Sequence, residues 1–131
     1  MKNLETIMQS MTFDFFGNGK HKICPDKILQ DKNNVLLDVR SKEETKTLSF
    51  KLLFHDILII EIPINEIPDR LNEIPKDKTI GVFCSSGVRA VIVYAYLLSL
   101  GYEKVKIVEG GYNLLIDEFK PGKLLKHISK S

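Results

Sequence analysis

Short runs of apolar residues, rich in β-branched side chains, recur along this chain and constrain its fold more than any other feature. The runs span residues 35–39, 57–62, 79–83 and 105–108. Because they are apolar at consecutive positions, they are typical of strands that are buried on both faces of a parallel sheet. Segments with helical character separate them. The pattern therefore predicts an α/β fold with a mostly parallel sheet.

Helix signals fall between and around the apolar runs. Ser41 and Glu44 have the spacing of a capping box, which predicts that a helix begins there. Gly101 is placed to end a helix over about residues 88–100. Further helices are expected over about residues 4–11, over 25–30 with Pro25 first, over 67–74 with Pro68 in the first turn, and from 112 with a break at 121–122. Residues 17–19, Gly-Asn-Gly, are expected to break the chain.

Size and charge narrow the classes of protein. The chain has 131 residues, enough for one domain with one core. Its 19 basic and 17 acidic residues give a net charge of +2, too small to indicate a nucleic-acid or membrane partner. The basic run of Lys120, Lys123, Lys126 and Lys130 is interpreted as a solvated face. Residues 90–98, the longest apolar stretch, fall well short of the roughly 20 residues of a membrane span, and we expect a cytoplasmic protein without a signal peptide.

The chain has two cysteines, Cys24 and Cys84. In a reducing compartment an unpatterned pair is not expected to form a structural disulfide. There is no C-x-x-C motif, and His21, His55 and His127 are scattered, so neither a metal site nor another cofactor is expected. Cys24 lies where a helix begins and is interpreted as a packing residue. A redox partnership with Cys84 is the alternative.

Cys84 ends one of the apolar runs and opens a short loop of small residues that leads into a helix. The loop consists of Cys84, Ser85, Ser86, Gly87, Val88 and Arg89. Ligands of open α/β sheets bind beyond the carboxyl ends of the strands, which is where this cysteine is expected. Gly87 permits a tight bend. The loop is therefore the candidate site.

The start of the following helix favours negative charge. The first amide groups of a helix have no intrahelical partner, and its N-terminus carries about half a positive charge. These groups can bind an anion and favour a thiolate over a thiol at Cys84. Arg89 adds a permanent cation. A buried, inert cysteine is the alternative, but the spacing of Cys84, Gly87 and Arg89 favours a nucleophile in a cradle for negative charge.

Three motifs together resemble single-domain sulfurtransferases of the rhodanese family. Residues 84–90 (CSSGVRA) resemble the active loop, residues 35–44 (VLLDVRSKEE) the strand end with its Glu-bearing helix, and residues 108–111 (VEGG) the last strand with its double-glycine turn. They cover about residues 35–112 in the family's order and spacing. The resemblance implies a rhodanese-like fold, with about five strands and helices on both faces of the sheet. It also implies a single domain over residues 1–131, in which residues 1–22 are an N-terminal extension.

Two departures from the family pattern concern other parts of the chain. The family's Gly-His-Ile-Pro-Gly-Ala stretch is represented by residues 54–63 (FHDILIIEIP), which keep the histidine and the closing Ile-Pro but lose the Gly-Pro turn. The chain also has no tryptophan to supply the aromatic that often follows the double glycine. The structure of residues 48–57 is therefore the least predictable.

The resemblance implies a double displacement at Cys84. Its thiolate would take the outer sulfur of a small anionic donor such as thiosulfate and become a persulfide. An acceptor would then remove that sulfur. The acceptor is cyanide or a thiol, and a protein can carry that thiol. Main-chain amides from Ser85 to Arg89 would stabilise the charged persulfide, and the Arg89 side chain would assist anionic donors and acceptors.

Two other functions stay open. Cysteine phosphatases also use a strand, loop and helix, but they place one residue more between cysteine and arginine than the four found between Cys84 and Arg89. The tighter ring suits a single sulfur better than a phosphate, and no acid for the leaving group is evident in the loop. A non-catalytic sulfur-relay or sensing module is the second alternative. Such a module would bind a protein partner, for which residues 48–56 are a candidate docking surface.

Asp38 and Arg40 follow an apolar run at the presumed mouth of the site. One interpretation is that they support the active loop. The other, which we favour, is a structural ion pair with Glu43 or Glu44, because ion-pair networks are the commoner explanation for such charges.

Overall fold

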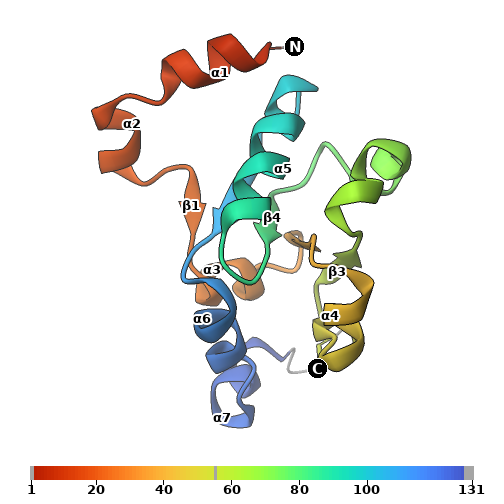
Figure 1. Cartoon of the computed structure of the whole chain (residues 1–131). Helices are drawn as coiled ribbons and strands as arrows, with labels where there is room; N and C mark the ends of the chain where they lie inside the picture. Colours follow the sequence, from red (N-terminus) through yellow and green to blue (C-terminus); the bar gives the residue numbers. More distant parts are fainter. Residues whose placement is uncertain (1, 55, 129–131) are drawn as a thin grey trace.

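Five strands form one parallel sheet within residues 2–54 and 56–128, the ranges that this computed structural model describes (Figure 1). The strands are β1 (Lys22–Ile23), β2 (Val35–Asp38), β3 (Leu58–Glu61), β4 (Ile80–Phe83) and β5 (Val105–Val108). Their order across the sheet is β1-β5-β4-β2-β3, so β4, which precedes Cys84, is the central strand. The predicted α/β fold is confirmed, and every strand pair is parallel.

Helices occupy the segments between and beyond the strands. The α-helices are α1 (Leu4–Ser10), α2 (Phe13–Asn18), α3 (Pro25–Gln30), α4 (Lys42–Thr47), α5 (Val88–Ser99), α6 (Gly111–Glu118) and α7 (Pro121–Leu124), and the 3₁₀ segments are η1 (Phe50–Leu52), η2 (Ile64–Glu73) and η3 (Leu125–His127). The predicted capping box begins α4, and Gly101, with a φ of 91°, follows the end of α5 as expected. None of the helices in the described ranges combines the length and hydrophobicity that crossing a membrane requires.

Alternate residues of the central strands face two different apolar layers. In β2, Val35 and Leu37 belong to a layer that also contains residues of α5 and η2. Leu36 belongs to a second layer, shared with α3, η1 and α6. All three side chains are buried. This double burial explains why the strand residues are apolar at consecutive positions.

The expected chain break at residues 17–19 is wrong in part. Gly17 and Asn18 lie inside α2, and only Gly19, with a φ of 66°, leaves the helical conformation. The side chain of Thr12 accepts a hydrogen bond from the Phe15 amide and caps this helix. A side-chain cap can stabilise a short helix that contains a glycine.

The edge strand β1 has no counterpart among the predicted strands, because two residues are too few for a periodic pattern. Lys22 lies opposite Ile107 of β5. On the N-terminal side of β1, α1 packs against α5, with Ile7 buried. The N-terminal segment that ends at Lys22 therefore packs against the domain and contributes a strand residue to its sheet.

The segment predicted as a helix over residues 67–74 is the 3₁₀ segment η2. It begins at Ile64, so that Pro68 lies in its middle rather than in the first turn, and Arg70 has non-helical dihedral angles (φ −126°, ψ 24°). Proline cannot donate the hydrogen bond that an α-helix interior needs, which favours short 3₁₀ turns here. The expected apolar face still holds, since Ile67 and Ile74 are buried.

Within the segment whose structure was the least predictable, residues 50–52 form the turn η1. Phe50 and Phe54 are buried in the layer shared with α3 and α6, and the Ser49 hydroxyl donates to the Glu61 carboxylate at 2.6 Å. Leu52 is exposed, whereas His55, expected to be a surface or hydrogen-bonded histidine, lies outside the described residues. A docking role for this segment stays a prediction.

Gly81→Ala tests the tight packing around β4. An added Cβ would lie 2.8 Å from Cδ1 of Ile28 and 3.1 Å from Cγ2 of Val108. We expect the free energy of unfolding to fall by about 1–3 kcal/mol, because overpacking a filled core forces its side chains to shift. Urea denaturation followed by circular dichroism measures the change.

Gly17→Ala is the matched control. Its Cβ would meet no heavy atom within 4 Å among the described residues, and it lies in α2. A gain of up to about 1 kcal/mol is expected from its helix propensity. Equal losses in the two variants would contradict the packing argument.

Candidate active site

Cys84 lies at the carboxyl end of the central strand β4, and the loop after it leads directly into α5 (Figure 1). The side chain is 1% exposed. Gly87 is the last residue before the helix and has a φ of 94°, a conformation that favours glycine. The predicted sequence of strand, cysteine, tight turn and helix is therefore present.

The sulfur of Cys84 accepts two main-chain hydrogen bonds at the head of α5. The Gly87 amide donates at 3.0 Å and the Ala90 amide at 3.3 Å. Donors were expected from Ser85 to Arg89. Gly87 falls in that range, whereas Ala90 lies one residue beyond it. The sulfur is therefore buried in the apolar layer shared with α5, yet it accepts from two amides at the start of that helix, a position that favours negative charge.

Arg89 is held by Glu44, which comes from the first turn of α4. The guanidinium donates through Nη1 to Oε1 at 2.6 Å and through Nη2 to Oε2 at 3.1 Å. The Ser85 hydroxyl also donates to Glu44, at 2.8 Å. Arg89 first, with help from the hydroxyl groups of Ser85 and Ser41, holds the pKa of Glu44 well below its usual range. The Glu44 carboxylate in turn raises the pKa of Arg89.

The sequence predicts the capping role of Glu44 but not its contact with the active loop. Both roles are present, because Glu44 Oε1 also accepts from the Ser41 amide at 3.0 Å. A usable signal did exist. Helices that follow neighbouring parallel strands begin at the same edge of a sheet, so the first turn of α4 had to lie near the loop after β4.

A hollow of about 700 Å³ opens beside the loop. It is lined by residues 85–88 and Val91 on one side and by residues 107–111 on the other, with Lys22 at its edge. We call this hollow the mouth. The side chains of Lys22 and Glu109, the charged residues among its described lining, lie 3.7 Å apart as an ion pair. The mouth therefore has no excess charge from its own lining.

The double-glycine turn packs directly against the active loop. Gly111 has a φ of 60°, and a Cβ there would lie 2.7 Å from the carbonyl oxygen of Ser85. The same oxygen accepts from the Tyr112 amide at 3.0 Å. The motif at residues 110–111 is thus needed for the close approach of the two loops.

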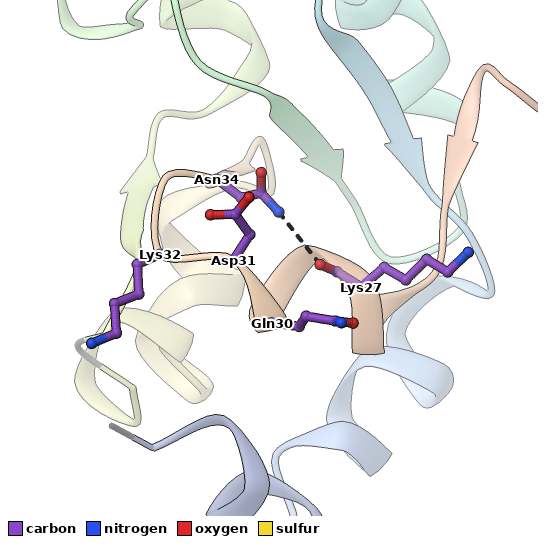
Figure 2. A pocket seen from close by; sticks show the side chains of 5 residues that line it. All are labelled: Lys27, Gln30, Asp31, Lys32 and Asn34. Atoms are coloured by element: carbon purple, nitrogen blue, oxygen red, sulfur yellow. Dashed lines mark hydrogen bonds between the residues drawn. The ribbon is translucent and has the colours of Figure 1, made fainter. Parts of the chain in front are cut away.

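A second hollow of similar volume lies away from this loop and has a different lining. Figure 2 shows its residues, Lys27, Gln30, Asp31, Lys32 and Asn34. The Asn34 amide group donates to the Lys27 carbonyl at 3.4 Å, which fixes the end of α3. No thiol is among the residues that line this hollow. Residues 85–88, which directly follow Cys84, line the mouth instead, so the mouth remains the candidate site.

Asp38 and Arg40 form a buried ion pair with each other. Arg40 donates to the Asp38 carboxylate at 2.7 Å, with exposed side-chain fractions of 2% and 0%, and to the Leu48 carbonyl at 2.9 Å. The expectation of a pair with Glu43 or Glu44 is wrong, because Arg40 turns back onto Asp38 while Glu44 binds Arg89. Burial raises the pKa of Asp38, and Arg40 opposes that shift.

Metal-binding residues were not expected near the histidines, but the fold brings Asp26 close to Glu118 and His127, which lie far from it in the sequence. Asp26, Glu118 and His127 have ligand atoms within 4.8 Å of one another. Lys126 Nζ lies 3.0 Å from Asp26 and 3.1 Å from Glu118, so a metal ion would have to replace this cation. Spacing along the chain could not have shown this cluster.

The remaining cysteine and histidine have local roles. Cys24 is free and half-buried at the start of α3, and Cys84 is free as well. His21 stacks on the ring of Phe15 with 4.7 Å between the centroids. Burial lowers its pKa, with the cation of Lys22 acting in the same direction.

Known proteins are similar to this chain in sequence and in fold. The sequence model of the rhodanese-like domain matches residues 26–118. A sulfurtransferase of Allochromatium vinosum is 37% identical over 84 residues, which cover 63% of this chain and 73% of that protein. The crystal structure of a rhodanese-related protein from Thermoplasma volcanium has a TM-score of 0.58 at 28% identity, covering 77% of this chain and 95% of that one. A rhodanese-like domain protein from Staphylococcus aureus has a TM-score of 0.57 at 32% identity, covering 72% and 89%.

Arg40→Met tests the buried ion pair. We expect the free energy of unfolding to fall by about 3–5 kcal/mol, because the Asp38 carboxylate loses its cation while it stays buried. Loss of Arg40 also raises the pKa of Asp38 further. A carboxyl whose pKa is raised on folding is stabilising at low pH and loses that contribution as pH rises, so the deficit should shrink between about pH 7 and about pH 4.

The control is the double variant Asp38→Leu/Arg40→Met, which removes both charges. Replacing a whole buried pair by apolar residues costs far less than breaking it. Chemical denaturation across this pH range compares the two variants. A double variant as unstable as Arg40→Met, or a deficit independent of pH, would contradict the assignment.

Proposed function

This chain belongs to the family of rhodanese-like domain proteins, and on that premise we propose that it transfers a sulfane sulfur atom from a donor such as thiosulfate to a thiophilic acceptor through a persulfide on Cys84. The observation that carries the proposal is the pair of amide hydrogen bonds from Gly87 and Ala90 to the Cys84 sulfur. Sulfurtransferase relatives support sulfur transfer as the class of reaction.

In the first half-reaction the Cys84 thiolate attacks the outer sulfur of the donor. A new S–S bond forms, the S–S bond of thiosulfate breaks, and its electron pair leaves with sulfite. The product is a persulfide anion on Cys84. The amides of Gly87 and Ala90 point at the Cys84 sulfur itself. Donors fixed in advance in this way stabilise the thiolate before it attacks, whereas the charge of the persulfide lies one S–S bond further out, on the transferred sulfur.

In the second half-reaction the acceptor attacks the outer sulfur of the persulfide. Cyanide leaves as thiocyanate, and a thiol acceptor leaves as a persulfide of its own. The S–S bond to Cys84 breaks, and its electron pair returns to the cysteine as a thiolate. The cycle needs neither a metal ion nor an organic cofactor, and we propose that it operates in the cytoplasm, where thiols stay reduced.

The other residues of the site have supporting roles in this proposal. Ser85, Ser86, Gly87 and Val88 form one wall of the mouth. Asp38 and Arg40 support the loop from within the core, since the Arg40 guanidinium lies 5.5 Å from the ring centroid of Phe83, the residue before Cys84.

Persulfide formation is tested by incubation with thiosulfate followed by intact-mass measurement. We expect one added sulfur atom, which cyanide removes as thiocyanate. Cys84→Ser should abolish both the mass increase and thiocyanate formation. Cys24→Ser is the matched control and should keep both, since Cys24 lies at the start of α3. Thiocyanate formation by Cys84→Ser would refute the mechanism, and loading without turnover would favour a sulfur-relay module.

Loop length is tested by inserting one alanine between Ser86 and Gly87. The insertion moves the Gly87 amide, which now lies 3.0 Å from the sulfur, so kcat/KM for thiosulfate should fall about tenfold or more. Hydrolysis of p-nitrophenyl phosphate, measured in parallel, tests the phosphatase alternative. Unchanged sulfur transfer by the longer loop would contradict the importance of the amide cradle.

A further inference from the structure

The cation of the active loop is already neutralised by a residue from another helix. Both terminal nitrogens of Arg89 donate to the two carboxylate oxygens of Glu44, at 2.6 and 3.1 Å. This bidentate arrangement is the strong form of the arginine–carboxylate ion pair. Because the pKa of Glu44 is held well below its usual range, the carboxylate stays charged at any physiological pH. Arg89 therefore cannot offer its charge to a substrate without leaving Glu44.

Arg89 lies in the loop beside the mouth rather than in its lining, and the described lining supplies no free cation of its own. Among its described lining residues, Lys22 is paired with Glu109. The Cys84 sulfur itself is bound by main-chain amides of Gly87 and Ala90, which carry no net charge. A dianion entering this mouth would lose hydration without finding an unpaired positive side chain.

The rim of the mouth next to the loop is apolar and exposed. Val88, at the start of α5, is 66% exposed, and Val91, one turn later, is 45% exposed. Both belong to the lining of the mouth. Their positions at i and i+3 place the two side chains on one face of the helix. A carbon group attached to the reacting sulfur could cover these valines and remove them from water.

We propose that Glu44 determines which sulfur donors the site accepts: by binding Arg89 it disfavours doubly charged inorganic donors and leaves a mouth suited to organic donors with at most one negative charge and an apolar carbon next to the sulfur. This inference rests on the proposed function and names its substrate class. Glu44 is a positioning residue in this scheme, because it acts through Arg89 and does not touch the reacting sulfur.

Two stable reagents differ in charge and in the group attached to the transferred sulfur. Thiosulfate carries two charges and no carbon, whereas benzenethiosulfonate carries one charge and an aromatic ring. With either reagent the Cys84 thiolate attacks the outer sulfur, the S–S bond breaks, and the leaving group takes the electron pair as sulfite or benzenesulfinate. The donor specificity is measured as kcat/KM at saturating cyanide, with thiocyanate as the common product.

The wild-type chain should prefer benzenethiosulfonate over thiosulfate by about tenfold or more in kcat/KM, mainly through KM. Glu44→Gln keeps an acceptor oxygen for the Ser41 amide, as in a capping box with glutamine, but releases the Arg89 charge. This variant should raise kcat/KM for thiosulfate by about tenfold and that for benzenethiosulfonate by only about threefold, because one charge gains about half as much attraction as two. The gain in kcat/KM for thiosulfate should shrink as the salt concentration rises.

Two controls isolate the role of Arg89. Glu43→Gln removes the same charge from an exposed neighbouring position of α4. It should leave kcat/KM unchanged for both donors. In Glu44→Gln/Arg89→Gln the gain for thiosulfate should disappear.

The outcomes that overturn the inference differ from those that overturn the proposed function. Equal losses for both donors in Glu44→Gln, carried by kcat, would mean that Glu44 only holds the loop. A wild-type preference for thiosulfate would also overturn the inference, and that measurement does not depend on the folding of any variant. Failure of both reagents to place sulfur on wild-type Cys84 would instead refute the proposed function itself.

Discussion

The parallel pairing of β2 with β4 is the constraint on which the site depends. Asp38 lies opposite Phe83 in this pair, and the Val39 amide donates to the Phe83 carbonyl at 2.9 Å. The two strands therefore end side by side, and the chain leaves each of them into a helix at the same edge of the sheet. This register lets Glu44, at the start of α4, reach Arg89 at the start of α5.

The charged side chains near Cys84 are paired with one another. The buried pair of Asp38 and Arg40 satisfies its own charges within the core, and Glu44 and Arg89 do the same at the edge of the loop. In the proposed mechanism the negative charge that develops on Cys84 is stabilised by main-chain amides and the start of α5. These groups are fixed by the helix, so stabilisation of charge on the sulfur itself does not require a long side chain.

Much of this arrangement could be predicted from the sequence, because local signals agreed with the final fold. The apolar runs gave four of the five strands of the described chain, and the Ser41–Glu44 spacing gave the start of α4. Features that depend on tertiary contacts were missed: β1 exists through its pairing with β5, and the second role of Glu44 depends on the neighbouring helix. The predicted partner of Arg40 was wrong for the same reason, because closeness in the sequence does not decide which of several carboxylates an arginine binds.

The near-complete burial of Cys84 has a consequence for the lifetime of the protein. Oxidation of a cysteine by peroxides depends on solvent access as well as on thiolate character. Cys84 is 1% exposed, so its sulfur is shielded from random encounters with oxidants. The burial that places this sulfur against the amides of α5 therefore also protects it from damage.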